Sequence, residues 1–266
     1  MTDEAMNLEA EMWGKTGKAY DGISFGLSDT ISHTVQTLWP KPGERILDIG
    51  TGTGWGARLA AWRGADVTGI DLAPGMIAAA ETLSANLQPR PNFQEAIAEA
   101  LPFADRTFDG VISTYGIIFS SDPEKAVAEV ARVLKPGGRL ALSTWADQPD
   151  GYIARFFALI SEWAGAPPPE HSPFAWGRAD WLRDVVGKRF DLGIREQETT
   201  LYAPNVETVW NEYVNGFGPV AVTYAGQPDD KKAAFKTAFE DFHRPFETEM
   251  GVVIPRAALV VRGQRL

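Results

Sequence analysis

The residues of clearest chemical meaning in the sequence are three glycines at alternate positions and one aspartate. Gly50, Gly52 and Gly54 stand between a short apolar segment and a stretch of helical composition. Because glycine has no Cβ, such a turn lets the backbone approach a ligand closely, and it aims the N–H groups of a helix start at an anionic or carboxyl group. Asp71 ends the next apolar segment, where a carboxylate can accept hydrogen bonds from both ribose hydroxyls of an adenine nucleoside. The pattern predicts an adenosyl ligand.

Two further residues distinguish between kinds of adenosyl ligand. Asp48 precedes Gly50 by two positions, where its charge would repel a pyrophosphate but would suit the positively charged amino acid tail of S-adenosylmethionine. A dinucleotide turn of the form Gly-x-Gly-x-x-Gly would need glycine at position 55, which is Trp55. These residues favour S-adenosylmethionine, and a nicotinamide-dependent oxidoreductase is the less favoured alternative. A carboxylate at Asp48 that is satisfied by loop N–H groups alone is the alternative to direct ligand contact.

The elements that must position these residues alternate regularly between positions 45 and 143. Short aliphatic runs predict buried strands at 45–49, 66–70, 92–96, 108–113 and 139–143. Helices are predicted at 55–63, at 74–87 and after Asp122, which has the composition of an N-cap followed by proline. Lys135-Pro-Gly-Gly138 is predicted to end that last helix. This alternation is typical of a parallel sheet with helices on its faces.

Beyond Trp145 the alternation stops. Helical patterns are predicted at 152–163, 180–186, 206–215 and 229–242, and two further strands at 192–201 and 252–261. We expect an α/β fold with a three-layer, doubly wound, mostly parallel seven-stranded sheet and helical insertions near the C-terminus. Three regions follow: an N-terminal helical cap at 1–40, an S-adenosylmethionine-binding core at 41–146, and acceptor-side insertions with the last two strands of the same sheet at 147–266.

Four segments together resemble a known family. Leu47–Gly54, Val67–Met76, Ala98–Asp109 and Val133–Leu140 are similar, in order, to the motifs of class I S-adenosylmethionine-dependent methyltransferases. The resemblance covers residues 40–145 and is greatest to small-molecule enzymes similar to the ubiquinone and menaquinone biosynthesis C-methyltransferases. It implies the Rossmann-like methyltransferase fold, with S-adenosyl-L-methionine as the methyl donor.

The resemblance also implies roles for individual residues. It places Gly50, Thr51, Gly52 and Thr114 against the methionine part of the cofactor. Asp71 is expected to bind the ribose, and adenine is expected to contact Leu72, Met76, Ala98 and Glu99. Ile97 stands where the family usually has an aspartate that accepts the adenine amino group, so that role falls to backbone groups or to another side chain such as Glu99. In related enzymes the N-terminal helix folds over the cofactor, so Trp13 and Tyr20 are expected near the sulfonium, where an aromatic ring attracts the positive charge.

No residue is assigned as catalytic. Methyl transfer from a sulfonium is an in-line displacement in which the protein supplies proximity, orientation and exclusion of water. Tyr20, Tyr115 and the three histidines could serve as a general base, but no motif supports any of them. A non-catalytic S-adenosylmethionine-binding protein therefore stays open as an alternative.

Composition limits the partners. The 266 residues carry 25 Lys and Arg against 35 Asp and Glu, a net charge of −10, which opposes wide contact with nucleic acid or an anionic bilayer. The chain has no cysteine and only three widely spaced histidines, so no metal site is expected. We expect a small-molecule methyl acceptor as partner, a homodimer as a further candidate assembly, and a cytoplasmic location because no targeting or membrane-spanning segment is evident.

Overall fold

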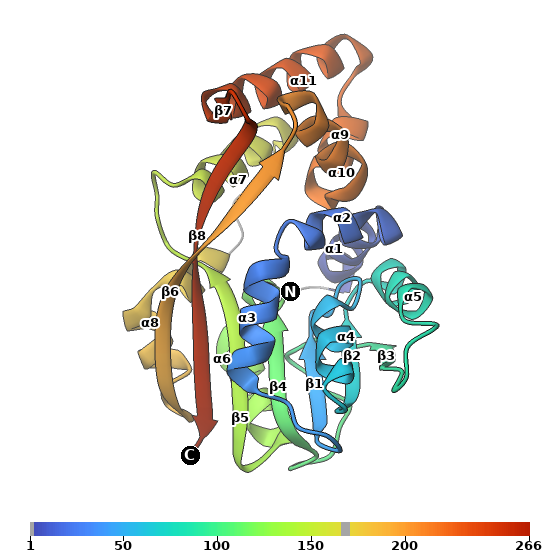
Figure 1. Cartoon of the computed structure of the whole chain (residues 1–266). Coiled ribbons are helices and arrows are strands. Elements are labelled where there is room, and N and C mark those ends of the chain that lie inside the picture. The colour runs from blue at the N-terminus through green and yellow to red at the C-terminus, as the bar shows by residue number, and fades with distance from the viewer. Residues whose placement is uncertain (1–2, 166–170) are drawn as a thin grey trace.

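Five strands that pair in parallel and three that are joined by antiparallel pairing form a single sheet in the computed structural model, which describes residues 3–165 and 171–266 (Figure 1). The order is β3-β2-β1-β4-β5-β8-β6, and β7 pairs with β8 beside this path. The bounds are β1 Arg45–Ile49, β2 Asp66–Asp71, β3 Asn92–Glu95, β4 Phe108–Thr114, β5 Leu134–Trp145, β6 Phe190–Ala203, β7 Glu247–Thr248 and β8 Gly251–Arg265. The predicted seven-stranded, mostly parallel sheet is confirmed, and β7 adds a two-residue pair.

The strand order changes direction between β1 and β4, which lie side by side at the centre of the parallel part of the sheet. Strands β1, β2 and β3 extend the sheet one way, and β4 and β5 extend it the other way. Open parallel sheets bind ligands in the crevice at such a switch point, beyond the carboxyl ends of the strands. Gly50, Asp71 and Thr114 all lie at these ends.

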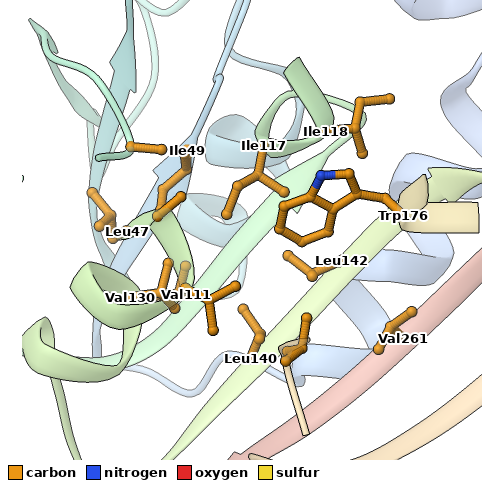
Figure 2. Close-up of a cluster of buried hydrophobic side chains, with 14 of the residues drawn as sticks. Leu47, Ile49, Val111, Ile117, Ile118, Val130, Leu140, Leu142, Trp176 and Val261 are labelled. Atoms are coloured by element: carbon orange, nitrogen blue, oxygen red, sulfur yellow. The ribbon is translucent and has the colours of Figure 1, made fainter. Parts of the chain in front are cut away.

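Helices cover both faces of the sheet. They are α1 Asp3–Gly14, α2 Tyr20–Phe25, α3 Ser28–Leu38, α4 Trp55–Trp62, α5 Pro74–Leu83, α6 Pro123–Val133, α7 Tyr152–Ala164, α8 Ala179–Val185, α9 Val206–Gly216, α10 Gly218–Gly226 and α11 Asp229–His243. On one face, Val130 of α6 and Trp176 pack over Leu47, Val111 and Leu142 (Figure 2). On the other face, α3 and α4 cover a second buried cluster.

The last two long strands leave the sheet as a ribbon. Residues 258–264 of β8 pair with β5, whereas residues 252–257 pair with 198–203 of β6 beyond the end of β5. Helices α7, α9, α10 and α11 surround this outer half and enclose a separate aromatic core (Figure 1). We call these four helices the helical insertion. Both strands are longer than predicted, and α10 was not predicted.

The first two helices lie between the sheet and the helical insertion (Figure 1). We call α1 and α2 the N-terminal lid. A Cβ on Gly75, at the start of α5, would stand 2.3 Å from the carbonyl oxygen of Gly14. A Cβ on Gly218, at the start of α10, would stand 2.3 Å from that of Met12. Backbone contacts on both sides thus fix α1, while α3 packs against the sheet itself.

Candidate active site

A cavity lies where the carboxyl ends of β1, β2 and β4 meet the N-terminal lid. Its empty volume is about 1080 Å³, including the part open to solvent. The glycine turn after β1 and Asp71 of β2 form its floor, and Glu9, Trp13 and Tyr20 of the lid cover it. The cavity therefore joins the switch point of the sheet to a segment far away in the sequence.

The glycine turn has the backbone conformation that the sequence pattern predicts. Gly50 and Gly52 have φ of 63° and 53°, in the left-handed region that favours glycine. A Cβ on Gly50 would stand only 2.6 Å from the Cα of Gly116, in the loop after β4. Gly50 thus allows the two loops to touch. Gly116 is a site residue that the sequence analysis missed, because no local pattern reveals the crossing.

Asp48 lies beneath the turn and does not line the cavity. Its side chain is fully buried, and Oδ2 accepts a 2.8 Å hydrogen bond from the Thr51 hydroxyl. Oδ1 is buried with no hydrogen-bond partner. Burial raises the pKa of Asp48 to about 7, although the hydrogen bond from Thr51 opposes the rise. Asp48 holds the loop, and direct ligand contact stays a prediction.

Asp71 lines the cavity with both carboxylate oxygens engaged by backbone. Oδ2 accepts from the Gly52 N–H at 2.8 Å, and Oδ1 from the Ala73 N–H at 3.0 Å. Burial raises the pKa of Asp71, and the two N–H donors oppose this rise. Each oxygen keeps a further lone pair for a ligand hydroxyl. The aspartate therefore connects the turn after β1 with the turn after β2.

The lid is anchored on the glycine turn by a second aspartate. Asp21 Oδ1 accepts from the Thr53 hydroxyl at 3.0 Å, from Trp55 Nε1 at 2.8 Å and from Arg58 Nη2 at 3.1 Å. The neighbouring Tyr20 ring lies over the turn, 3.7 Å from where a Cβ of Gly52 would stand. Trp55, which breaks the dinucleotide pattern, thus serves as a donor to the lid.

The other end of the cavity is mostly apolar. Leu72, Met76, Ile97 and Ala98 line it. Glu99 lines it as well, but its Oε1 already accepts three hydrogen bonds at 2.6–3.3 Å, from the backbone N–H groups of residues 121–122 and the Ser121 hydroxyl. Glu99 therefore shapes the loop before α6.

The cavity brings together every predicted site residue except Asp48, namely Tyr20, Gly50, Thr51, Gly52, Asp71, Leu72, Met76, Ala98, Glu99 and Thr114. Tyr115 lines it too, at φ of 59°, with its ring stacked on Trp145 at 4.2 Å.

The three histidines lie elsewhere. His33 and His171 are exposed, and His243 is buried in the helical insertion, where its Nε2 shares a hydrogen bond with the Tyr152 hydroxyl. Glu9, Leu27 and Ile31 of the lining were missed, since the N-terminal helices carry no motif.

Comparison with known proteins gives the family. Residues 47–142 match the model of a methyltransferase domain. A demethylmenaquinone methyltransferase of Renibacterium salmoninarum is 32% identical over 168 residues, 57% of this chain and 69% of that protein. The chain belongs to the S-adenosylmethionine-dependent methyltransferases. S-Adenosylmethionine is accordingly its methyl donor, as the sequence motifs predicted.

Further relatives and solved structures agree with this membership. An uncharacterized protein of Mycobacterium tuberculosis is 34% identical over 205 residues, 73% of this chain and 72% of that one. The YcgJ protein of Bacillus subtilis has the same fold, with a TM-score of 0.61 at 22% identity over 89% of this chain and 98% of its own. In the described part of this methyltransferase, no helix is long and apolar enough to cross a membrane. The same residues contain no group of three or more potential metal ligands.

Proposed function

We propose that this methyltransferase transfers the methyl group of S-adenosylmethionine to a small-molecule acceptor within the cavity beneath the lid. The observation that carries the proposal is the cover over the glycine turn, where Trp13, Tyr20 and Phe119 surround the space beside it. An aromatic, partly enclosed cavity suits a small apolar acceptor better than a polymer. The acidic composition and the similarity to a demethylmenaquinone methyltransferase support the same class of acceptor.

The residues of the cavity fit the cofactor. Gly52 leaves open the space that a Cβ would fill, with the Tyr20 ring 3.7 Å away, so the methionine part would lie against the turn and Thr114. Asp71 would bind the ribose hydroxyls with its remaining lone pairs. Leu72 and Met76 would pack against adenine, with Ala98 and Glu99 at its far edge. Tyr20 would lie beside the sulfonium, where its ring attracts the charge.

The chemistry follows from proximity. The bound cofactor supplies an electrophilic methyl group, and the protein orients the acceptor and excludes water. Burial raises the pKa of both Tyr20 and Tyr115 well above the usual range, so neither phenol is ionised near neutral pH. We therefore assign no general base, and we expect an acceptor that is nucleophilic by itself.

In our proposal, three regions of the chain have separate roles in methyl transfer. Residues 1–40 cover the cofactor, residues 41–146 bind it, and residues 147–266 shape the acceptor side and complete the sheet. The packing of the lid supports this division, because Tyr20 and Trp13 lie against the aromatic core of the helical insertion, with the Trp13 ring 5.6 Å from Phe217. A homodimer and a cytoplasmic location stay predictions.

Calorimetric titration with S-adenosylhomocysteine tests the cofactor site. We expect saturable binding to the parent protein, weakened in Asp71→Ala by about 1.5–3 kcal/mol for hydrogen bonds to a charged group. Turnover of S-adenosylmethionine with a panel of small molecules then separates an enzyme from a binding protein. Binding without turnover of any acceptor would favour the non-catalytic alternative, and a folded parent that binds nothing would contradict the proposal.

A further inference from the structure

The adenine end of the cavity has an unmet requirement for a hydrogen-bond acceptor. Adenine carries a 6-amino group with two N–H donors, and burying a donor without a partner is costly. Leu72, Met76, Ile97 and Ala98 offer this end no side-chain acceptor. A charged side-chain acceptor for the amino group must therefore be one of the carboxylates of the lining, which are those of Glu9, Asp71 and Glu99.

Among the described residues, three carboxylates line the cavity, and two of them already accept hydrogen bonds from the core. Asp71 accepts one backbone N–H on each oxygen, and Glu99 accepts three hydrogen bonds from the loop before α6, all on Oε1, so both carboxylates are held by the core. The third is Glu9 of α1, whose partner is the Trp13 side chain one helical turn further on. Its carboxylate is half-buried and, unlike the other two, belongs to the lid.

The packing of α1 fixes where Glu9 stands. The Trp13 ring lies 5.2 Å from Phe119 of the core and 5.6 Å from Phe217 of the helical insertion. At its end, α1 touches the start of α5, the helix that carries Met76. Burial, followed by repulsion from Glu99 and then from Asp71, raises the pKa of Glu9. Glu9 thus lines the cavity together with Asp71 and Glu99, where a hydrogen-bond donor would relieve the repulsion.

We propose that Glu9 accepts a hydrogen bond from the 6-amino group of the adenine ring, so that the lid reads the base of the cofactor. This inference rests on the proposed function. It makes Glu9 a specificity-determining residue that takes the place of an acidic side chain at position 97. A site built to hydrogen-bond a donor rejects an analogue that lacks it, because the buried acceptor is left unpaired.

The test compares two ligands on four proteins. The ligands are S-adenosylhomocysteine and its analogue with hydrogen in place of the 6-amino group. The proteins are the parent, Glu9→Met, which removes the acceptor at similar length, Glu9→Gln, which keeps an acceptor oxygen without charge, and Glu11→Met. Glu11 is exposed on the same helix and does not line the cavity, so it is the matched control.

We expect the parent and Glu11→Met to prefer the adenine ligand by about 10- to 100-fold, the range for a hydrogen bond to a charged group. Glu9→Met should reduce this preference to about threefold or less, and Glu9→Gln should be intermediate. A Glu9→Met protein that keeps the parent's preference, or that weakens both ligands equally, would overturn the inference while leaving the proposed function intact. Failure of the parent to bind S-adenosylhomocysteine would overturn both.

Discussion

At the scale of single residues, Asp48 carries a carboxyl group where water does not reach. The side chain is fully buried, and only one of its two oxygens has a hydrogen-bond partner. Burial raises its pKa from 3.8 to about 7. The folded protein therefore binds this proton more tightly than the unfolded chain does. The resulting stabilisation is fully present below about pH 3.8 and is lost as the pH rises through about 7.

This argument predicts how Asp48→Asn changes the pH dependence of stability. Between pH 4 and pH 8, ionisation of Asp48 should destabilise the parent by up to about 4 kcal/mol, and the amide removes this titration. The free energy of unfolding of Asp48→Asn, measured relative to the parent by urea denaturation, should therefore improve as the pH rises from 5 to 8. A difference that is constant across this range would show that Asp48 does not titrate there.

The same scale shows what the sequence could reveal of the site. Gly50, Gly52 and Asp71 were identified because their chemistry depends on local spacing after a strand. Gly116 and Glu9 were missed because their roles depend on contacts between distant segments, one with Gly50 and one with the cavity. Spacing along the chain contains no signal for such contacts.

At the scale of elements, the carboxylate of Asp21 makes most of the hydrogen bonds that join α2 to the glycine turn, beside a longer 3.4 Å contact between the Ser24 and Thr53 hydroxyls. Asp21 accepts three hydrogen bonds from the turn and from α4, including one from Arg58, which is only 8% exposed. Removing the charge of the partly buried Asp21 leaves the buried Arg58 guanidinium without compensation. The position of Tyr20 over the turn should therefore depend on Asp21.

We predict that Asp21→Asn raises the dissociation rate of S-adenosylhomocysteine about tenfold, the effect of losing a hydrogen bond between charged groups. Stopped-flow tryptophan fluorescence measures this rate, because Trp13 and Trp55 line the cavity. Asp29→Asn is the matched control. Asp29, in the same N-terminal region, accepts a 2.6 Å hydrogen bond from the Thr199 hydroxyl but does not line the cavity. Equal rates for the two variants would mean that Asp21 contributes only general stability.

Elements with a regular local pattern were predicted well, and those shaped by tertiary packing were not. Strands β1 to β4 and helix α4 fall within one residue of their predicted positions because each combines an apolar run with a clear stop signal. Helix α10 begins with Gly218 and Pro219, which resemble a loop in sequence, yet proline fits the first turn of a helix. Helix α6 does end before Lys135–Gly138, as predicted, but these residues already belong to strand β5, which begins at Leu134. The pairing of β5 with β4 shifts register between Phe108 and Gly110.

At the scale of the whole molecule, the two hydrophobic cores share their longest strands. Val252 and Ile254 of β8 are buried in the core of the helical insertion, whereas Leu259 and Val261 of the same strand are buried in the cluster between α6 and the sheet, which we call the main core. Strand β6 also runs through both. The lid adds a further connection, because Trp13 contacts Phe119 on one side and Phe217 on the other. The two cores are therefore joined by continuous strands and by the lid, and we expect them to unfold together.

This continuity predicts that the molecule unfolds in one cooperative transition. Phe239 is fully buried in the insertion core, with ring centres 5.2 Å from Trp210 and 4.2 Å from His243, and Phe108 is 1% exposed in the main core. Replacing either by alanine should cost about 3–5 kcal/mol through lost burial and the cavity left behind. Because β6 and β8 connect the cores, both variants should lower the same single calorimetric transition, and S-adenosylhomocysteine should raise it. Two transitions, with Phe239→Ala shifting one and Phe108→Ala the other, would mean that the helical insertion folds independently of the cofactor-binding sheet.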